Sequence, residues 1–129
     1  MFSRRSRRAA KQPDERIDGD DVVATLSDAD FETFTSGTYS AVDFYATWCG
    51  PCRALAPVFD AAATSHRGPV RFGRLDVDAN PETAALLNVL SIPTIVIFDP
   101  AGLEIDRLVG AAGAPQLETF LTAALAGAW

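Results

Sequence analysis

The chain has 129 residues, 48% of them hydrophobic, which suits one compact domain with a buried core of its own. The formal net charge of −6 hides an asymmetry, because residues 1–16 sum to +4 whereas residues 17–129 sum to −10. The acidic part argues against a nucleic-acid-binding surface on the domain, and no apolar run approaches the ~18 residues of a membrane span.

Residues 1–20 hold almost no apolar side chains, and from this we predict a basic, disordered N-terminal arm followed by one domain at residues 21–129. Two interpretations of the arm stay open: a solubilising tail, or a segment that docks on an acidic partner or on the domain's own acidic face. Residues 1–12 also have the composition of a short organellar transit peptide. Because no apolar secretory segment follows and the cysteines are only two, we expect a cytoplasmic protein.

The first predicted elements are a short strand at residues 22–25, where β-branched residues gather, and a helix after it. Ser27, followed by Asp30 three residues on, has the spacing of a capping box. The phenylalanines that come next mark the buried face of this helix, which we expect to end at Gly37.

Residues 39–46 predict a central strand that is apolar enough to be covered on both faces. Asp43 interrupts this strand. A carboxylate is costly to bury there in its ionised form, so we expect a raised pKa for Asp43. Two interpretations are open: an acid at the wet end of the strand, or a desolvated acid that donates and accepts protons a few residues before Cys49.

The strand leads into Trp48-Cys49-Gly50-Pro51-Cys52, where an alternating pattern gives way to a helical one. Its two cysteines, the only ones in the chain, have the C-x-x-C spacing of a redox dithiol. At the start of a helix the unpaired N–H groups and the macrodipole favour a thiolate, so we expect a lowered pKa for Cys49, the exposed thiol, but not for Cys52. Gly50 gives the turn freedom, and Pro51 fixes φ near a helical value where its missing N–H costs little.

Two other interpretations of the cysteine pair are weaker. A structural disulfide that encloses two residues constrains almost no loop and so adds little stability. Half of a zinc site would need a second pair of ligands, and the chain offers only His66. A reactive dithiol without a metal is therefore the favoured prediction.

The helix that begins at this motif is predicted to reach about residues 66–69. Pro57 lies inside it and removes one hydrogen bond, so we expect a kink after the first turns. His66 near the C-terminal end is expected to interact favourably with the helix dipole.

A strand is predicted at residues 70–77, and a short helix at residues 81–89 with Asn80 as its N-cap. Residues 91–98 predict a further strand, and Pro93 fits its beginning because a strand-start residue loses nothing by having no N–H.

Residues 99–102 fit a type I turn, so residues 105–109 should return antiparallel as a hairpin. Pro115 opens a last helix with its apolar residues on one face, and Trp129 at the end either packs or frays. The alternating strands and helices require right-handed parallel crossovers, and the hairpin adds antiparallel strands. We therefore predict an α/β fold of order β-α-β-α-β-α-β-β-α, with a central mixed β-sheet and helices on both faces.

Residues 21–128 resemble the thioredoxin family, with its motifs in register: Asp43, Trp48-Cys49-Gly50-Pro51-Cys52, Pro57, Ile92-Pro93-Thr94 and Val109-Gly110. The resemblance implies the thioredoxin fold, with a cis peptide bond before Pro93 that faces the cysteines. It also implies that Asp43 handles the proton of the buried cysteine, Cys52, and that Gly110 lies in the substrate groove.

The function that the resemblance implies is that of a protein-disulfide reductase. Cys49 is expected to attack a disulfide of a target protein, and Cys52 to resolve the mixed disulfide. The expected electron donor is a flavoprotein, thioredoxin reductase. The chain described here is expected to be a monomer with no bound cofactor or metal and with neither nucleic acid nor membrane as a partner. Substrate contacts are expected from Trp48, Gly50, Pro51, Ile92, Pro93 and Gly110.

Two alternatives to this function stay open. An oxidase or isomerase of the cell envelope is one, although such relatives usually carry His rather than Gly-Pro between the cysteines. The other is an interaction module whose partner binding, rather than turnover, is its main role. The chain departs from the family in its basic arm, in Tyr45 where many members have Trp, and in Arg74 where many carry Lys near the buried aspartate. Because guanidinium and ammonium groups differ in reach and hydration, the tuning of Asp43 by Arg74 stays open.

Overall fold

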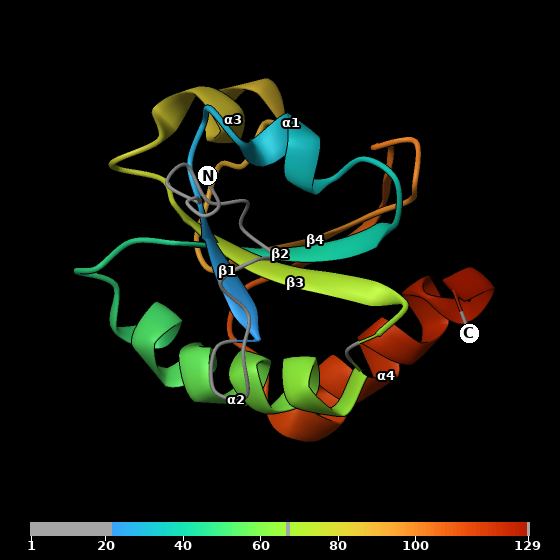
Figure 1. Cartoon of the computed structure of the whole chain (residues 1–129). Coiled ribbons are helices and arrows are strands. Elements are labelled where there is room, and N and C mark those ends of the chain that lie inside the picture. Colours follow the sequence, from blue (N-terminus) through green and yellow to red (C-terminus); the bar gives the residue numbers. More distant parts are fainter. Residues whose placement is uncertain (1–21, 67, 129) are drawn as a thin grey trace, which may run out of the picture.

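The structure, a computed structural model, describes residues 22–66 and 68–128 (Figure 1). The predicted arm at residues 1–20 and Trp129 lie outside the described residues. The helices and strands follow one another as predicted, and a short 3₁₀ turn, η2, comes last. They are β1 (Val23–Leu26), α1 (Phe31–Phe34), β2 (Tyr39–Tyr45), α2 (Gly50–His66), β3 (Val70–Asp76), α3 (Pro81–Leu86), β4 (Thr94–Phe98), β5 (Glu104–Val109), α4 (Ala114–Ala124) and η2 (Ala126–Ala128).

The five strands form one mixed sheet in the order β1-β3-β2-β4-β5. β1, β3 and β2 are parallel, whereas β4 runs antiparallel to both β2 and β5. In Figure 1, α1 and α3 lie on one face of the sheet, and α2 and α4 lie on the other. The predicted α/β fold, with a mixed sheet and helices on both faces, is confirmed.

Each face of the sheet packs its own hydrophobic core. Because side chains alternate along a strand, Ala41 of β2 and Phe72 of β3 pack with residues of α2 and α4, whereas Val42 and Phe44 pack on the other face. Every residue of β2 between the two at its ends is buried. This confirms that β2 is a central strand covered on both sides, and it places Asp43 among buried apolar residues.

The hairpin and the helix at the C-terminal end also match the prediction. The N–H of Gly102 donates to the carbonyl oxygen of Asp99 at 2.8 Å, which closes the turn between β4 and β5. After the hairpin, α4 turns Leu117 and Leu121 into the core that it shares with α2. The boundaries of β1, β2, β3 and β5 lie within about one residue of the predicted ones. The same holds for the end of β4, for both ends of α2 and for the start of α4.

The first helix, Phe31–Phe34, is shorter than predicted and does not reach Gly37. The N–H of Ser27 donates to Asp30 Oδ1 at 2.8 Å, which is the acid half of the predicted capping box, but this bond closes a turn ahead of the helix. At the other end, the hydroxyl group of Thr35 donates to the carbonyl oxygen of Phe31 at 3.2 Å. The N–H of Thr35 donates to the same oxygen at 3.0 Å, but the N–H of Ser36 reaches only the carbonyl oxygen of Thr33, so the helical ladder stops after one turn.

The third helix, Pro81–Leu86, also ends before its predicted boundary, because Asn88 has a left-handed φ of 57°. Asn80 precedes this helix, but its side chain does not cap it. The carboxylate of Asp28 caps it instead, accepting the N–H of Thr83 at 2.9 Å, while Asn80 Oδ1 accepts the N–H of Asp28 at 3.0 Å. The predicted local cap is therefore replaced by hydrogen bonds between two distant segments, one around Asp28 and the other around Asn80.

The fourth strand begins at Thr94 and not at residue 91 as predicted. Residues 91–93 form a bend, which the hydroxyl group of Thr94 closes by donating to the carbonyl oxygen of Ser91 at 2.7 Å. Pro93 has no N–H to offer to the sheet, so the hydrogen-bonded ladder starts after it and not at it.

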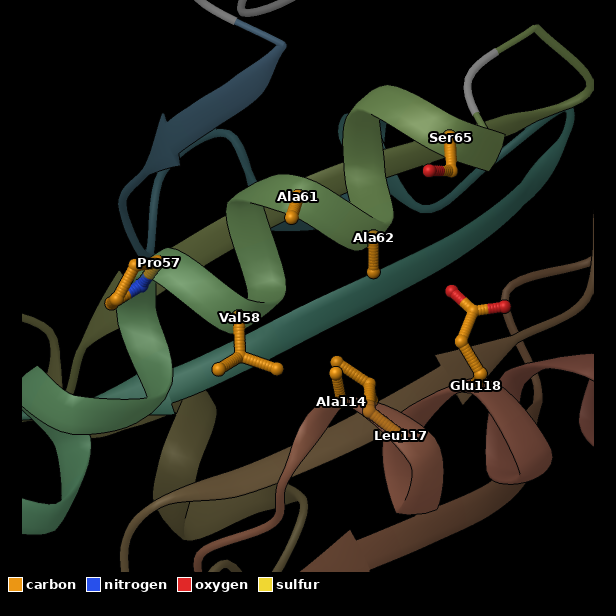
Figure 2. Close-up of a pocket in the computed structure, with 8 residues that line it drawn as sticks. All are labelled: Pro57, Val58, Ala61, Ala62, Ser65, Ala114, Leu117 and Glu118. Carbon is orange, nitrogen blue, oxygen red and sulfur yellow. The ribbon is translucent and has the colours of Figure 1, made fainter.

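A groove of about 430 Å³ runs between α2 and α4 (Figure 2). Val58 of α2 and Leu117 of α4 line its middle, and Pro57 and Glu118 lie toward its opposite ends. His66 Nε2 lies 2.8 Å from Glu118 Oε1, so the last turn of α2 is tied to α4. His66 has the predicted place at the helix end, and Glu118 is a specific partner that the sequence pattern did not indicate.

Candidate functional site

The cysteine motif lies where β2 gives way to α2, and Cys49 occupies the N-cap position of that helix. The carbonyl oxygen of Cys49 accepts the N–H of Arg53 at 3.1 Å, which is the first bond of the helical ladder. The sulfur of Cys49 accepts the N–H of Cys52 at 3.2 Å. A side-chain atom that takes an N–H of the first turn is the mark of an N-cap, so the predicted position of Cys49 is confirmed.

Cys49 and Cys52 are joined by a disulfide, with their Cα atoms 5.2 Å apart. The two residues are 4% and 2% exposed, so Cys49 is not the openly exposed thiol that the sequence suggested. They nevertheless face different surroundings, since Cys49 lines an outer groove and Cys52 lines a separate cavity behind it. The pair is reachable from solvent on the Cys49 side.

The outer groove has a volume of about 550 Å³, and none of its lining side chains carries a charge. Trp48 is 68% exposed and Leu90 is 85% exposed, so two large apolar side chains stand open to solvent there. Four of the predicted substrate contacts line it, whereas four further lining residues were not predicted: Val77, Val89, Leu90 and Ser91. The lining residues are Trp48, Cys49, Gly50, Pro51, Val77, Val89, Leu90, Ser91 and Ile92.

The other two predicted substrate contacts, Pro93 and Gly110, lie against each other and not in the lining of the groove. The N–H of Gly110 donates to the carbonyl oxygen of Pro93 at 2.8 Å. The peptide bond between Ile92 and Pro93 is cis, as expected, and the side chain of Ile92 packs against the cluster that Ala46 forms with the two cysteines. Gly110 has a φ of 99°, which favours glycine.

Trp48 is held by a residue that the sequence analysis missed. Its indole Nε1–H donates to Asp78 Oδ2 at 2.6 Å. Asp78 lies beyond the end of β3, where its own N–H donates to Asp76 Oδ1 at 2.9 Å. Trp48 and Asp78 are 30 positions apart, and no local pattern in the sequence indicates that they meet.

Asp43 lies in the middle of β2 and is 1% exposed. Its Oδ1 atom has no hydrogen-bond partner among the described residues. Burial raises the pKa of Asp43 to about 7, the positive charge of Arg74 opposes this rise and the negative charge of Asp60 adds to it. The direction is the predicted one, and the interpretation of Asp43 as an acid at the wet end of a strand is wrong.

The cavity behind the disulfide brings together Asp43, Cys52 and Arg74, three of the predicted site residues. Its volume is about 290 Å³. Arg74 does not bond to Asp43, however, because its Nη2 donates to Asp60 Oδ1 on α2. Asp60 was not predicted as a site residue. The cavity is lined by Asp43, Tyr45, Ala46, Thr47, Cys52, Arg53, Ala56 and Arg74.

Within residues 22–66 and 68–128, no group of three or more His, Cys, Asp or Glu side chains is arranged to hold a metal ion. None of the helices in this part of the chain is long and apolar enough to cross a membrane.

Comparisons with known proteins agree with this geometry. Residues 22–123 match the family model described as Thioredoxin. Similar curated proteins include the thioredoxins of Staphylococcus aureus strains MW2 and COL. Each of these is 43% identical over 89 residues, which cover 69% of this chain and 85% of the relative.

Proposed function

Because this chain belongs to the thioredoxin family and is a thiol-disulfide oxidoreductase, we propose that it reduces disulfides of target proteins, with Cys49 attacking and Cys52 resolving. One observation carries the proposal. The sulfur of Cys49 caps α2 and borders an uncharged groove, whereas Cys52 borders a second cavity, whose lining includes the buried Asp43. The two sulfurs therefore have different access to a protein substrate.

In the first step, the Cys49 thiolate attacks one sulfur of the target disulfide. A mixed disulfide forms, and the other target sulfur leaves as a thiolate that takes a proton from solvent. The N–H of Cys52 and the positive end of the α2 dipole both stabilise negative charge on the Cys49 sulfur. They stabilise it again when Cys49 becomes the leaving group during re-reduction of the pair.

In the second step, Cys52 attacks the Cys49 sulfur, the bond to the target breaks, and the second target thiolate leaves. Two electrons have then passed from the dithiol to the target, and the Cys49–Cys52 disulfide remains. Asp43 accepts the proton that Cys52 gives up. In support, both residues line a cavity large enough for a water molecule that relays the proton. The pKa of Asp43, raised to about 7, also suits a base that works near neutral pH.

The target segment lies in the outer groove, against Trp48, Gly50, Pro51 and Ile92. It pairs in extended form with the backbone of Ile92 as an added strand, so that main-chain bonds supply affinity without a strict sequence requirement. Pro93 and Gly110 shape the end of this surface, since the bond between them holds the bend before β4 against the end of β5. The hydrogen bond from Trp48 to Asp78 keeps the indole ring at the rim.

The electron donor is a flavin-dependent thioredoxin reductase, so that the protein carries electrons from this enzyme to its targets and serves cell redox homeostasis. We place it in the cytoplasm as a monomer that needs no bound cofactor. Both cysteines of the chain belong to the redox pair, which leaves none for a structural disulfide. This is the cysteine usage of a reducing compartment.

The test is reduction of insulin by the full chain, with NADPH and a bacterial thioredoxin reductase as the electron source. We expect NADPH consumption together with precipitation of the insulin B chain, and loss of both in Cys49→Ser. If dithiothreitol supports turnover and the reductase does not, the proposed donor is wrong. If neither supports turnover although targets still bind, the alternative of an interaction module replaces the proposal.

A further inference from the structure

Asp43 and Arg74 are neighbours on adjacent strands, and yet their side chains do not pair. They stand opposite each other in the register of the parallel strands β2 and β3. Both belong to the set of alternating residues that faces α2, and both line the cavity behind the disulfide. A guanidinium and a carboxylate that meet form a short, strong hydrogen bond, so an ion pair between these two side chains would be favourable.

Arg74 bonds to Asp60 instead. Its Nη2 donates to Asp60 Oδ1, which draws the guanidinium toward α2. The Asp60 side chain is 49% exposed and the Arg74 side chain 24%, so the pair lies at the mouth of the cavity and not inside it. Asp43, which is almost wholly buried, is left with an Oδ1 that has no hydrogen-bond partner in the described part of the chain.

Among residues 22–66 and 68–128, no other cation takes the place of Arg74 at Asp43. The ionisable groups around the cavity are Tyr45 from β2, Cys52 and Arg53 from α2, and Arg74 from β3, with Asp60 at its mouth. The guanidinium of Arg53 is anchored elsewhere, because its Nη1 donates to the carbonyl oxygen of Thr47 at 2.9 Å.

We propose that Asp60 is a positioning residue, which holds Arg74 away from the buried Asp43 carboxyl group and thereby keeps that group available as a proton acceptor. The inference rests on the proposed role of Asp43 in the resolving step. A carboxylate paired with Arg74 would be a weaker base, since a cation within ~4–6 Å lowers a carboxyl pKa by about 1–3. Asp60 thus acts on the reaction through Arg74, without touching Cys52.

The experiment is a carboxyl NMR titration of Asp43 in the full chain, kept in the disulfide form so that neither cysteine titrates. In Asp60→Ala, Arg74 loses its partner and turns to Asp43. The titration midpoint of Asp43 should then fall by about one pH unit or more. In Arg74→Gln the midpoint should rise. When Asp60→Ala is combined with Arg74→Gln, the fall of the midpoint caused by Asp60→Ala should be smaller. Only the part that comes from the lost negative charge of Asp60 should remain.

Two matched variants separate positioning from a general effect of charge or fold. Asp60→Glu keeps a carboxylate for Arg74 and should hold the midpoint near that of the wild type. Glu82→Ala removes an acid from α3, on the other face of the sheet, and should leave the midpoint in place. Melting temperatures of all the variants show whether each one is folded.

The inference is overturned if Asp60→Ala leaves the midpoint unchanged, or if the fall is equally large with and without Arg74. The pH dependence of target release from the mixed disulfide, measured on the same variants, tests the role of Asp43 separately. If the midpoint moves and the release profile does not, Asp60 still positions Arg74, and it is the proposed proton transfer from Cys52 to Asp43 that fails.

Discussion

The N–H of Cys52 donates to the sulfur of Cys49 at 3.2 Å, so one cysteine of the pair caps the helix that carries the other. In the reduced pair, this position at the positive end of α2 stabilises negative charge on the Cys49 sulfur, and Cys52 lies one turn further in. The same arrangement turns Cys49 to the outer groove and Cys52 to the cavity that holds Asp43. The two sulfurs therefore lie in different surroundings, and we expect single substitutions to separate their proposed roles.

Cys49→Ser should abolish reduction of target disulfides, because no sulfur remains beside the outer groove to attack. Cys52→Ser should still attack once and then persist as a mixed disulfide with the target, because no second thiol resolves it. Mass spectrometry after exposure to oxidised insulin measures the adduct. A Cys49→Ser protein that traps more target than Cys52→Ser would reverse the assignment of the two sulfurs.

Asp43→Asn should stabilise the fold in a pH-dependent way. Below pH 3.8 both the folded and the unfolded chain keep the Asp43 proton, so the two proteins should have similar stability. Between pH 3.8 and about 7 the unfolded chain releases this proton while the folded chain retains it, so wild-type stability falls as the pH rises. The gain for Asn should level off above pH 7, at up to about 4 kcal/mol if a pKa unit is taken as ~1.4 kcal/mol.

Urea unfolding of both oxidised proteins at several pH values measures this gain. Equal gains at pH 3.5 and pH 8 would show that the effect comes from packing and not from the proton on Asp43. The resolving step should also slow several-fold in Asp43→Asn, since the amide cannot accept a proton from Cys52.

Leu90→Glu should weaken substrate binding, because it puts a charge and a desolvation cost into a groove that has no charged lining. We expect kcat/KM for insulin reduction to fall about threefold to tenfold. A tenfold fall corresponds to ~1.4 kcal/mol, which is less than the ~1.5–3 kcal/mol that a fully buried leucine contributes. Leu103→Glu is the control, since Leu103 is 65% exposed and precedes β5 at the end of the sheet away from the groove. Equal losses in both variants would remove Leu90 from the substrate surface.

Gly110→Ala and Gly50→Ala form a second matched pair. A Cβ atom at either position would meet nothing within 4 Å, so neither change creates a clash. Gly110 has a φ of 99°, however, and an alanine there should cost about 1–2 kcal/mol of the free energy of unfolding. Gly50 lies in the first turn of α2, where alanine should leave stability unchanged or slightly higher. Urea unfolding of both variants measures the difference, and equal stabilities would contradict it.

Much of this protein was predictable from local sequence patterns, because periodicity and turn residues act over a few positions. The alternation along β2, the C-x-x-C at its junction with α2, and the turn at Asp99 predicted the element order and the place of the cysteine pair. A carboxylate among the apolar residues of a central strand likewise predicted the raised pKa of Asp43. The resemblance to a family added the cis bond before Pro93, which no local pattern would have favoured.

Only the tertiary structure decided which hydrogen-bond and ion-pair partners come from distant segments of the chain. Asp28 rather than Asn80 caps α3, Asp78 accepts a hydrogen bond from Trp48, and Asp60 pairs with Arg74. Each of these carboxylates looks like an ordinary acidic surface residue in the sequence, since a hydrogen bond between distant segments leaves no periodic trace. Which acid meets which donor depends on how β2, β3 and α2 pack, and that packing is set by the two hydrophobic cores as a whole.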